Sequence, residues 1–155
     1  MPPNALLDTN VWVSAFLKPN GPPGRVVAAW LRGEFAVVSS TVQLGEIADV
    51  LGRTRLRRRF AFVRRDVNTY LRVIATRSVL VSIPRTLKIC RDPDDNDILE
   101  AAIHGGAQYL VTRDDDLKRD LDLIHIARQQ GLRVVSVAHF LAYLSRRRKR
   151  PRAGR

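Results

Sequence analysis

Acidic residues gather in four segments of the chain, and their arrangement could support chemistry on a phosphate ester. Asp8 directly follows the apolar run 5–7, and Glu46 stands within the apolar-rich stretch 42–51. The other two groups are denser, and they comprise Asp92, Asp94, Asp95 and Asp97, and then Asp114, Asp115 and Asp116. Clustered carboxylates repel one another unless a cation joins them, and Mg²⁺ and Mn²⁺ prefer oxygen ligands. Such ions activate water and stabilise the charge that develops during phosphodiester cleavage, so the pattern predicts metal-dependent hydrolysis.

The third acidic group precedes a predicted helix over 94–104, and the phase of that helix helps to choose among its acids. At about 100° per residue, one apolar face is formed by Ile98, Leu99, Ala102 and Ile103. Asp95 projects near the middle of this face, Asp97 points nearly opposite, and Asp94 lies at the edge. Because a carboxylate on a buried face is costly unless a cation meets it, we expect Asp95 to be the ligand. Asp94 and Asp97 would then do no more than favour the helix N-terminus electrostatically.

Other catalytic and metal-binding patterns are not supported by the residues. The histidines His104, His125 and His139 lack zinc-ligand spacing, and no pair of cysteines accompanies them. Asp92 and Asp94 begin a stretch like a calcium loop, but Asp97 occupies its glycine position and Ile103 its final glutamate position, which excludes an EF-hand. No phosphate-binding loop and no glycine-rich dinucleotide motif is present.

Short apolar strands alternate with helices along the chain. We predict strands over 5–7, 35–39, 79–83, 109–112 and 133–137. We predict helices over 25–33, over 41–51 with Ser40 or Thr41 as its cap, over 53–77, 94–104 and 138–144, and a loop or helix over 117–130. This alternation indicates an α/β fold with three layers and a central parallel sheet. Sites in such sheets form at the carboxyl ends of the strands. Asp8 alone could cap a turn and Glu46 alone could be solvated, but acids in several segments around one sheet favour a shared site.

The composition indicates one folded domain inside the cell. Apolar residues make up 45% of the 155 residues, which allows a single hydrophobic core over residues 1–144. Residues 145–155 hold seven basic side chains and no core residues, so we expect a basic, disordered tail. Cys90 is the only cysteine, which excludes a disulfide framework and fits a reduced, cytoplasmic compartment. The sequence has neither a signal peptide nor an apolar run of about 20 residues, so we expect no membrane association.

Four segments resemble, in order, the motifs of the PIN-domain family. They are 6–14 (LLDTNVWVS), 43–47 (QLGEI), 92–102 (DPDDNDILEAA) and 110–117 (LVTRDDDL). The resemblance covers roughly residues 4–144, and the most similar subgroup is the toxin components of prokaryotic toxin–antitoxin pairs. It implies a Rossmann-like α/β/α fold and a ribonuclease that depends on Mg²⁺ or Mn²⁺. It also implies a homodimer or higher oligomer, and an antitoxin protein that blocks the site.

The resemblance further implies which residues form the site. The implied acidic pocket comprises Asp8, Glu46, Asp95 and Asp114, with Asp116 as an additional metal ligand. Asn10 and Thr112 would support the carboxylates by hydrogen bonding. The third acid has two alternatives. Reading residues 97–102 against the commoner family pattern places it at Asp97, whereas counting back from Gly106 places it at Asp95, in agreement with the helix phase.

The net charge of +12 indicates a polyanionic partner, because neutralising phosphates releases counterions. A basic patch follows the predicted helix that carries Glu46, and it comprises Arg53, Arg55, Arg57, Arg58, Arg59, Arg64 and Arg65. We expect this patch to hold the RNA backbone; the alternative is a solvated helix face. Phe60 and Phe62 beside it are expected to pack rather than to stack on bases. The tail over 146–155 could add nonspecific affinity for RNA or have no role.

Three other functions compete with a toxin nuclease. A haloacid-dehalogenase-type phosphatase also places an aspartate after its first strand, but it needs a second one two residues on, where Asn10 stands. A noncatalytic RNA- or protein-binding module on the same fold would gain nothing from a repulsive acidic pocket. A stand-alone RNA-processing nuclease is equally compatible with the acids, and the sequence does not separate it from a toxin.

Overall fold

The computed structural model describes residues 2–90, 92–113 and 119–150. A parallel sheet of five strands lies at its centre, in the order β3-β2-β1-β4-β5. The strands are β1 (Asn4–Leu7), β2 (Ala36–Ser40), β3 (Val79–Val81), β4 (Tyr109–Thr112) and β5 (Arg133–Ser136). All five strand predictions are confirmed to within two residues at each end. The two strands that flank β1 come from distant parts of the chain, so the sheet brings residue 8 beside residue 112.

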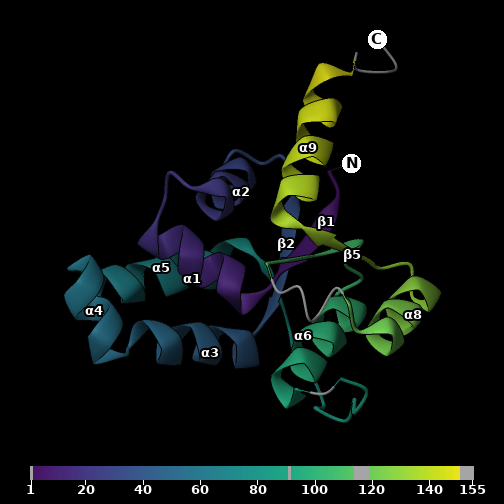
Figure 1. Ribbon diagram of the computed structural model, residues 1–155, viewed down its shortest axis with the longest axis horizontal. Coiled ribbons are helices and arrows are strands. Elements are labelled where there is room, and N and C mark those ends of the chain that lie inside the picture. The colour runs from purple at the N-terminus through teal and green to yellow at the C-terminus, as the bar shows by residue number, and fades with distance from the viewer. Residues whose placement is uncertain (1, 91, 114–118, 151–155) are drawn as a thin grey trace.

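Helices cover both faces of the sheet (Figure 1), which confirms the predicted three-layer α/β fold. They are α1 (Thr9–Leu17), α2 (Pro22–Leu31), α3 (Thr41–Leu51), α4 (Thr54–Phe60), α5 (Arg64–Arg77), α6 (Pro93–His104), α8 (Leu121–Gln129) and α9 (Val137–Lys149). Successive strand residues point to opposite faces. Accordingly, Ala5 and Leu7 pack with α1, α2, α3, α5 and α9, whereas Leu6 packs with α6 and α8.

Helix α1 has no counterpart among the predicted elements. Five of its nine residues are buried, and they are Thr9, Val11, Trp12, Val13 and Ala15. Trp12 packs edge-on against Trp30 of α2, with ring centroids 5.2 Å apart. A helix that is buried on most sides lacks the polar stripe by which an amphipathic helix is recognised in a sequence.

The prediction of one continuous helix over 53–77 is wrong. The chain forms two helices, α4 and α5, and Ala61 between them adopts a left-handed conformation with φ of 52°. Phe62 then packs edge-on against Phe16 of α1, with ring centroids 5.0 Å apart. The expectation that Phe62 is a packing residue is therefore confirmed. No glycine or proline marks the break, so the local sequence did not reveal it.

The prediction of a short last helix and a disordered tail from residue 145 is also wrong, because α9 continues to Lys149. Leu144 is buried, and one turn later Arg148 forms an ion pair with Glu34 at 3.1 Å. These two contacts hold the basic turn 145–149 against the body of the protein. Residues 151–155 lie outside the described part. Among the described helices, none combines the length and the apolar character needed to cross a membrane.

Candidate functional site

A pocket of about 360 Å³ opens where β1 ends, between α3 and the N-terminal turn of α6. Its lining is mainly acidic, and it comprises Asp8, Thr9, Asn10, Glu46, Asp49, Val50, Arg53, Asp92, Asp94, Asp95 and Ile98. Three of the four predicted acidic segments therefore meet in one place. The fourth, which contains Asp114, Asp115 and Asp116, lies outside the described residues.

Asp8 is held by the strand next to its own. Its backbone N–H donates to the carbonyl of Val111 at 2.9 Å, which extends the pairing of β1 and β4 by one residue. The hydroxyl of Thr112 donates to Asp8 Oδ2 at 2.9 Å, as predicted. Only 6% of Asp8 is exposed. The carboxylate thus has a defined orientation at the carboxyl end of the sheet.

Glu46 is positioned by the buried side chain of Gln43, one turn earlier in α3. Gln43 Nε2 donates to the carbonyl of Leu7 at 2.6 Å, and the Ser39 hydroxyl donates to Gln43 Oε1 at 2.6 Å. Ser40 caps α3 by accepting from the backbone N–H of Gln43 at 3.0 Å, which confirms one of the two predicted caps. These bonds tie the start of α3 to the ends of β1 and β2, so the next turn projects Glu46 into the pocket.

Thr9, which the sequence analysis missed, supports Glu46. Its hydroxyl donates to Glu46 Oε2 at 2.9 Å. Asn10, which was expected in this role, lines the pocket, but its side chain makes no hydrogen bond within the described part of the chain. Choosing between these neighbours requires the phase of α1, and that helix was not predicted.

Helix phase did not predict that Asp97 would be buried. One carboxylate oxygen each from Glu46, Asp94 and Asp97 lies within 4.8 Å of the others. Asp97 is only 7% exposed, although helix phase placed it opposite the buried face. Asp95 is half-buried and lines the same pocket, so its predicted role as a ligand remains a prediction.

The segment 82–90 explains this burial, because it covers the polar face of α6. The Arg85 guanidinium bonds both oxygens of Asp97, at 3.3 and 3.0 Å. The amide and hydroxyl of Thr86 donate to Glu100 at 3.2 Å. The backbone N–H groups of residues 89 and 90 donate to Asn96 at 2.8 and 2.7 Å. The buried side chains of Asn96, Asp97 and Glu100 on α6 therefore each have a partner, although Glu100 Oε2 is buried without a hydrogen bond.

Burial raises the pKa of the Glu46 carboxyl from 4.5 to about 7. The hydrogen bond from Thr9 lowers this pKa, while the negative charges of Asp94, Asp97 and Asp8 raise it. A divalent cation would relieve this repulsion. Ligands on opposite sides of Mg²⁺ lie about 4.2 Å apart, because each lies about 2.1 Å from the metal. The oxygen donors and their spread within 4.8 Å therefore fit Mg²⁺ or Mn²⁺.

We expect Mn²⁺ to bind more weakly as the pH falls below the pKa of Glu46, which is about 7. Its pKa is raised in the folded state, so its contribution to stability is complete below pH 4.5 and is lost as the pH rises through about 7. Metal binding must displace the proton, so affinity should weaken by about tenfold for each pH unit below 7. Calorimetric titration with Mn²⁺ between pH 5 and 8 measures this. A dissociation constant that stays constant over the range would contradict it.

We expect Arg85→Gln to tighten Mn²⁺ binding by about threefold, because the guanidinium neutralises the acids that the metal would bind. The effect is small because the Arg85 side chain is 62% exposed. Lys88→Gln is the matched control, since it removes one positive charge from the same segment without touching the acids. Equal affinities for the two variants would show that Arg85 does not compete with the metal.

Comparison with known proteins places this arrangement in a family. The uncharacterized protein MJ1680 of Methanocaldococcus jannaschii is 30% identical over 112 residues, which are 72% of this chain and 71% of that protein. A chain of VapBC2 from Rickettsia felis, solved bound to a DNA fragment from their promoter, superposes with a TM-score of 0.56 at 18% identity, covering 86% of this chain and 98% of that one. A chain of FitAB bound to the IR36 DNA fragment gives a TM-score of 0.51 at 20% identity, covering 86% and 94%.

The likeness to these two solved structures concerns the fold, since both identities are low. The sequence match is more specific, because the model of the PIN domain matches residues 4–116. That range contains the parallel strands β1 to β4 and every described residue of the acidic pocket. The chain therefore belongs to the PIN domain family.

Proposed function

We propose that the protein is a ribonuclease that needs a divalent metal ion to hydrolyse RNA phosphodiester bonds. The observation that carries the proposal is that carboxylate oxygens of Glu46, Asp94 and Asp97 lie within 4.8 Å of one another, beside the pocket that Asp8, Glu46 and Asp94 line. We assign the metal to these four acids. Asp97 is preferred to Asp95 because its carboxylate belongs to the cluster. Asp95, and Asp114 and Asp116 beyond the described residues, remain candidate ligands.

A bound Mg²⁺ or Mn²⁺ would supply Lewis acidity and would lower the pKa of water. The protein's own contribution is to hold its carboxylates in fixed positions before the metal binds. Thr112 orients Asp8 and Thr9 orients Glu46, each through a hydrogen bond of 2.9 Å. Among the described residues that line the pocket there is no serine, cysteine or histidine. We therefore propose direct hydrolysis, without a covalent bond between protein and substrate.

The basic surface beside the pocket supports RNA as the substrate. Arg53, which lies between α3 and α4, lines the acidic pocket itself. Five further arginines of the patch are exposed on α4 and α5, and they are Arg55, Arg58, Arg59, Arg64 and Arg65. An acidic site would repel a polyanion without such flanking cations, because like charges still repel each other within the screening length of about 10 Å in 0.1 M salt. The patch would hold the strand while the metal neutralises the acids.

We further propose that the protein is the toxin of a toxin–antitoxin pair. Support comes from its resemblance to that subgroup and from two structural neighbours solved as VapBC2 and FitAB complexes. An antitoxin partner, a homodimer or higher oligomer, and a cytoplasmic location are part of this proposal. A stand-alone RNA-processing nuclease is the alternative. Growth arrest on expression, relieved by a protein encoded beside this one, would support the toxin, whereas expression without arrest would favour the alternative.

The test of the nuclease is cleavage of labelled structured and single-stranded RNAs with Mg²⁺, with Mn²⁺ and with EDTA. We expect cleavage with either metal and none with EDTA. Cleavage that continues in EDTA would contradict a metal-dependent site. RNA binding that is insensitive to metal and leads to no cleavage would favour a noncatalytic binding module.

A further inference from the structure

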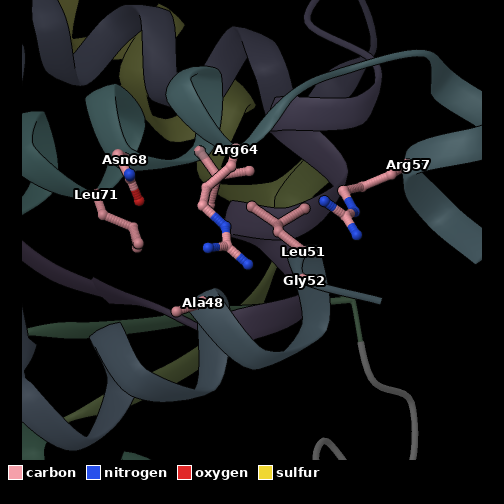
Figure 2. A pocket seen from close by; sticks show the side chains of 8 residues that line it. Ala48, Leu51, Gly52, Arg57, Arg64, Asn68 and Leu71 are labelled. Carbon is pink, nitrogen blue, oxygen red and sulfur yellow. The ribbon is translucent and has the colours of Figure 1, made fainter. Parts of the chain in front are cut away.

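A second pocket, of about 190 Å³, lies between α3, α4 and α5 (Figure 2). Its lining comprises Ala48, Leu51, Gly52, Arg57, Arg64, Val67, Asn68 and Leu71. Apolar side chains from α3 and α5 form much of this surface. The guanidinium groups of Arg57 and Arg64 extend into the space between the helices, with Leu51 lying between them in this view. The pocket therefore combines an apolar surface, two positive charges and the amide of Asn68.

The two arginines lack partners in the described part of the protein. Arg57 Nε is buried and makes no hydrogen bond there. Neither Arg57 nor Arg64 forms an ion pair with a described acid. A buried donor without a partner is costly and therefore uncommon in folded proteins. Both observations point to an anionic ligand that would complete the hydrogen bonding of Arg57.

The second pocket and the acidic pocket lie on opposite faces of α3. At about 100° per residue, Glu46 and Val50 project to one side, and both line the acidic pocket, as does Arg53 just beyond the helix. Ala48, Leu51 and Gly52 project to the other side and line the second pocket. Gly52 and Arg53 are neighbours at the end of the helix. A chain-like ligand can therefore pass from one pocket to the other over the end of α3.

We propose that the second pocket binds one nucleotide of the RNA strand that is cleaved in the acidic pocket. This inference rests on the proposed function and assigns a binding site to its substrate. Arg57 and Arg64 would hold the phosphodiester, since guanidinium groups donate paired hydrogen bonds to phosphate oxygens. The base would lie against Leu51 and Leu71, and Asn68 would bond its edge.

The surroundings favour a nucleic acid over an acidic peptide. Seven arginines and no acids occupy residues 53–65. Asp66, the acid that follows, is engaged in a hydrogen bond from the backbone N–H of Val63 at 3.1 Å. The positive field thus extends well beyond the pocket, as a polyanion requires. The apolar lining suits the flat face of a base. Inorganic phosphate or a carboxylate would leave this lining uncovered.

The experiment measures binding of a short, end-labelled single-stranded RNA by fluorescence anisotropy in EDTA, so that no cleavage takes place. The double variant Arg57→Gln with Arg64→Gln should bind about tenfold more weakly, because it loses charge-assisted hydrogen bonds. The matched control is Arg72→Gln with Arg77→Gln, which removes two exposed charges from α5 outside the pocket. It should weaken binding by no more than about twofold, through the general field.

A third variant tests the space in the pocket independently of its positive charge. Ala48→Leu fills the space and keeps every arginine, so it should also weaken RNA binding by about tenfold if a nucleotide enters. Circular dichroism checks that each variant folds. If Ala48→Leu does not fold, the comparison of the two arginine pairs alone tests the inference. Equal affinities for the two arginine pairs would overturn the inference. Polyglutamate that competes as strongly as RNA would overturn it in favour of an acidic protein.

These outcomes are independent of the nuclease test. Metal-dependent cleavage together with unchanged binding by the pocket variants would overturn the nucleotide site and leave the proposed function intact. Weakened binding by those variants without cleavage under any metal would support the nucleotide site and overturn the nuclease.

Discussion

Glu46→Gln should abolish metal-dependent RNA cleavage, with a loss of about three orders of magnitude in rate. Glutamine keeps the shape of the side chain and its contact with Thr9, but it removes the charge at the centre of the acidic cluster. Mn²⁺ affinity should fall with the activity, because Glu46 contributes one of the three neighbouring oxygens. Rate measurements with labelled RNA and calorimetric titration with Mn²⁺ test the two effects. Asp8→Asn should cause a similar loss of activity.

Asp49→Asn is the matched control for Glu46→Gln. Asp49 lies on the same helix and lines the same pocket, but it does not belong to the oxygen cluster. Its replacement removes the same charge and should leave most of the activity. Glu46→Gln should also unfold at a higher temperature than the unmodified protein at pH 8 in EDTA, because it removes a carboxylate whose ionisation burial opposes. An inactive variant that is less stable would indicate misfolding, and an active one would contradict the proposed role of Glu46.

Gly24→Ala should destabilise the protein by about 3 kcal/mol, because it adds a methyl group where the backbone is already closely packed. Gly24 is buried in the first turn of α2. A Cβ atom at this position would overlap the carbonyl group of Pro19 and would lie 2.7 Å from its Cα. Pro19 belongs to a tight turn in which the amide of Gly21 donates to the carbonyl of Lys18 at 3.0 Å. The neighbour is therefore backbone that cannot move aside as a side chain would, and urea unfolding measures the cost.

Gly45→Ala is the opposite case and serves as the control. Gly45 lies in the middle of α3, where a Cβ would meet nothing within 4 Å. Alanine should therefore stabilise the helix by about 0.5–1 kcal/mol. Both substitutions replace glycine by alanine. If they change the free energy of unfolding in opposite directions, the difference comes from the local environment of each glycine. A Gly24→Ala protein as stable as the unmodified one would show that the α1–α2 turn can relax.

Local patterns in the sequence were enough to determine the sheet and to place Asp8 at its carboxyl edge. Each strand is a short apolar run bounded by turn residues, and the alternation with helices allows little other than a parallel sheet. The carboxyl ends of parallel strands meet at one edge, so Asp8 after β1 was placed correctly beside Thr112 of β4. Glu46 came instead from the resemblance to the PIN-domain motifs, because a glutamate within a helix could by itself be solvated.

Contacts between distant segments decided the remainder. Helix phase placed Asp97 opposite the apolar face of α6, but it did not reveal that the segment 82–90 covers that side and that Arg85 pairs with the carboxylate. This segment has no periodic pattern, so its position could not be read from its sequence. The break at Ala61 likewise depends on Phe62 reaching Phe16, some 46 residues away along the chain. That break folds α4 and α5 over α3 and divides the basic patch, bringing Arg57 and Arg64 into one pocket. Side-chain spacing determines which groups share a face, whereas only tertiary packing determines what meets that face.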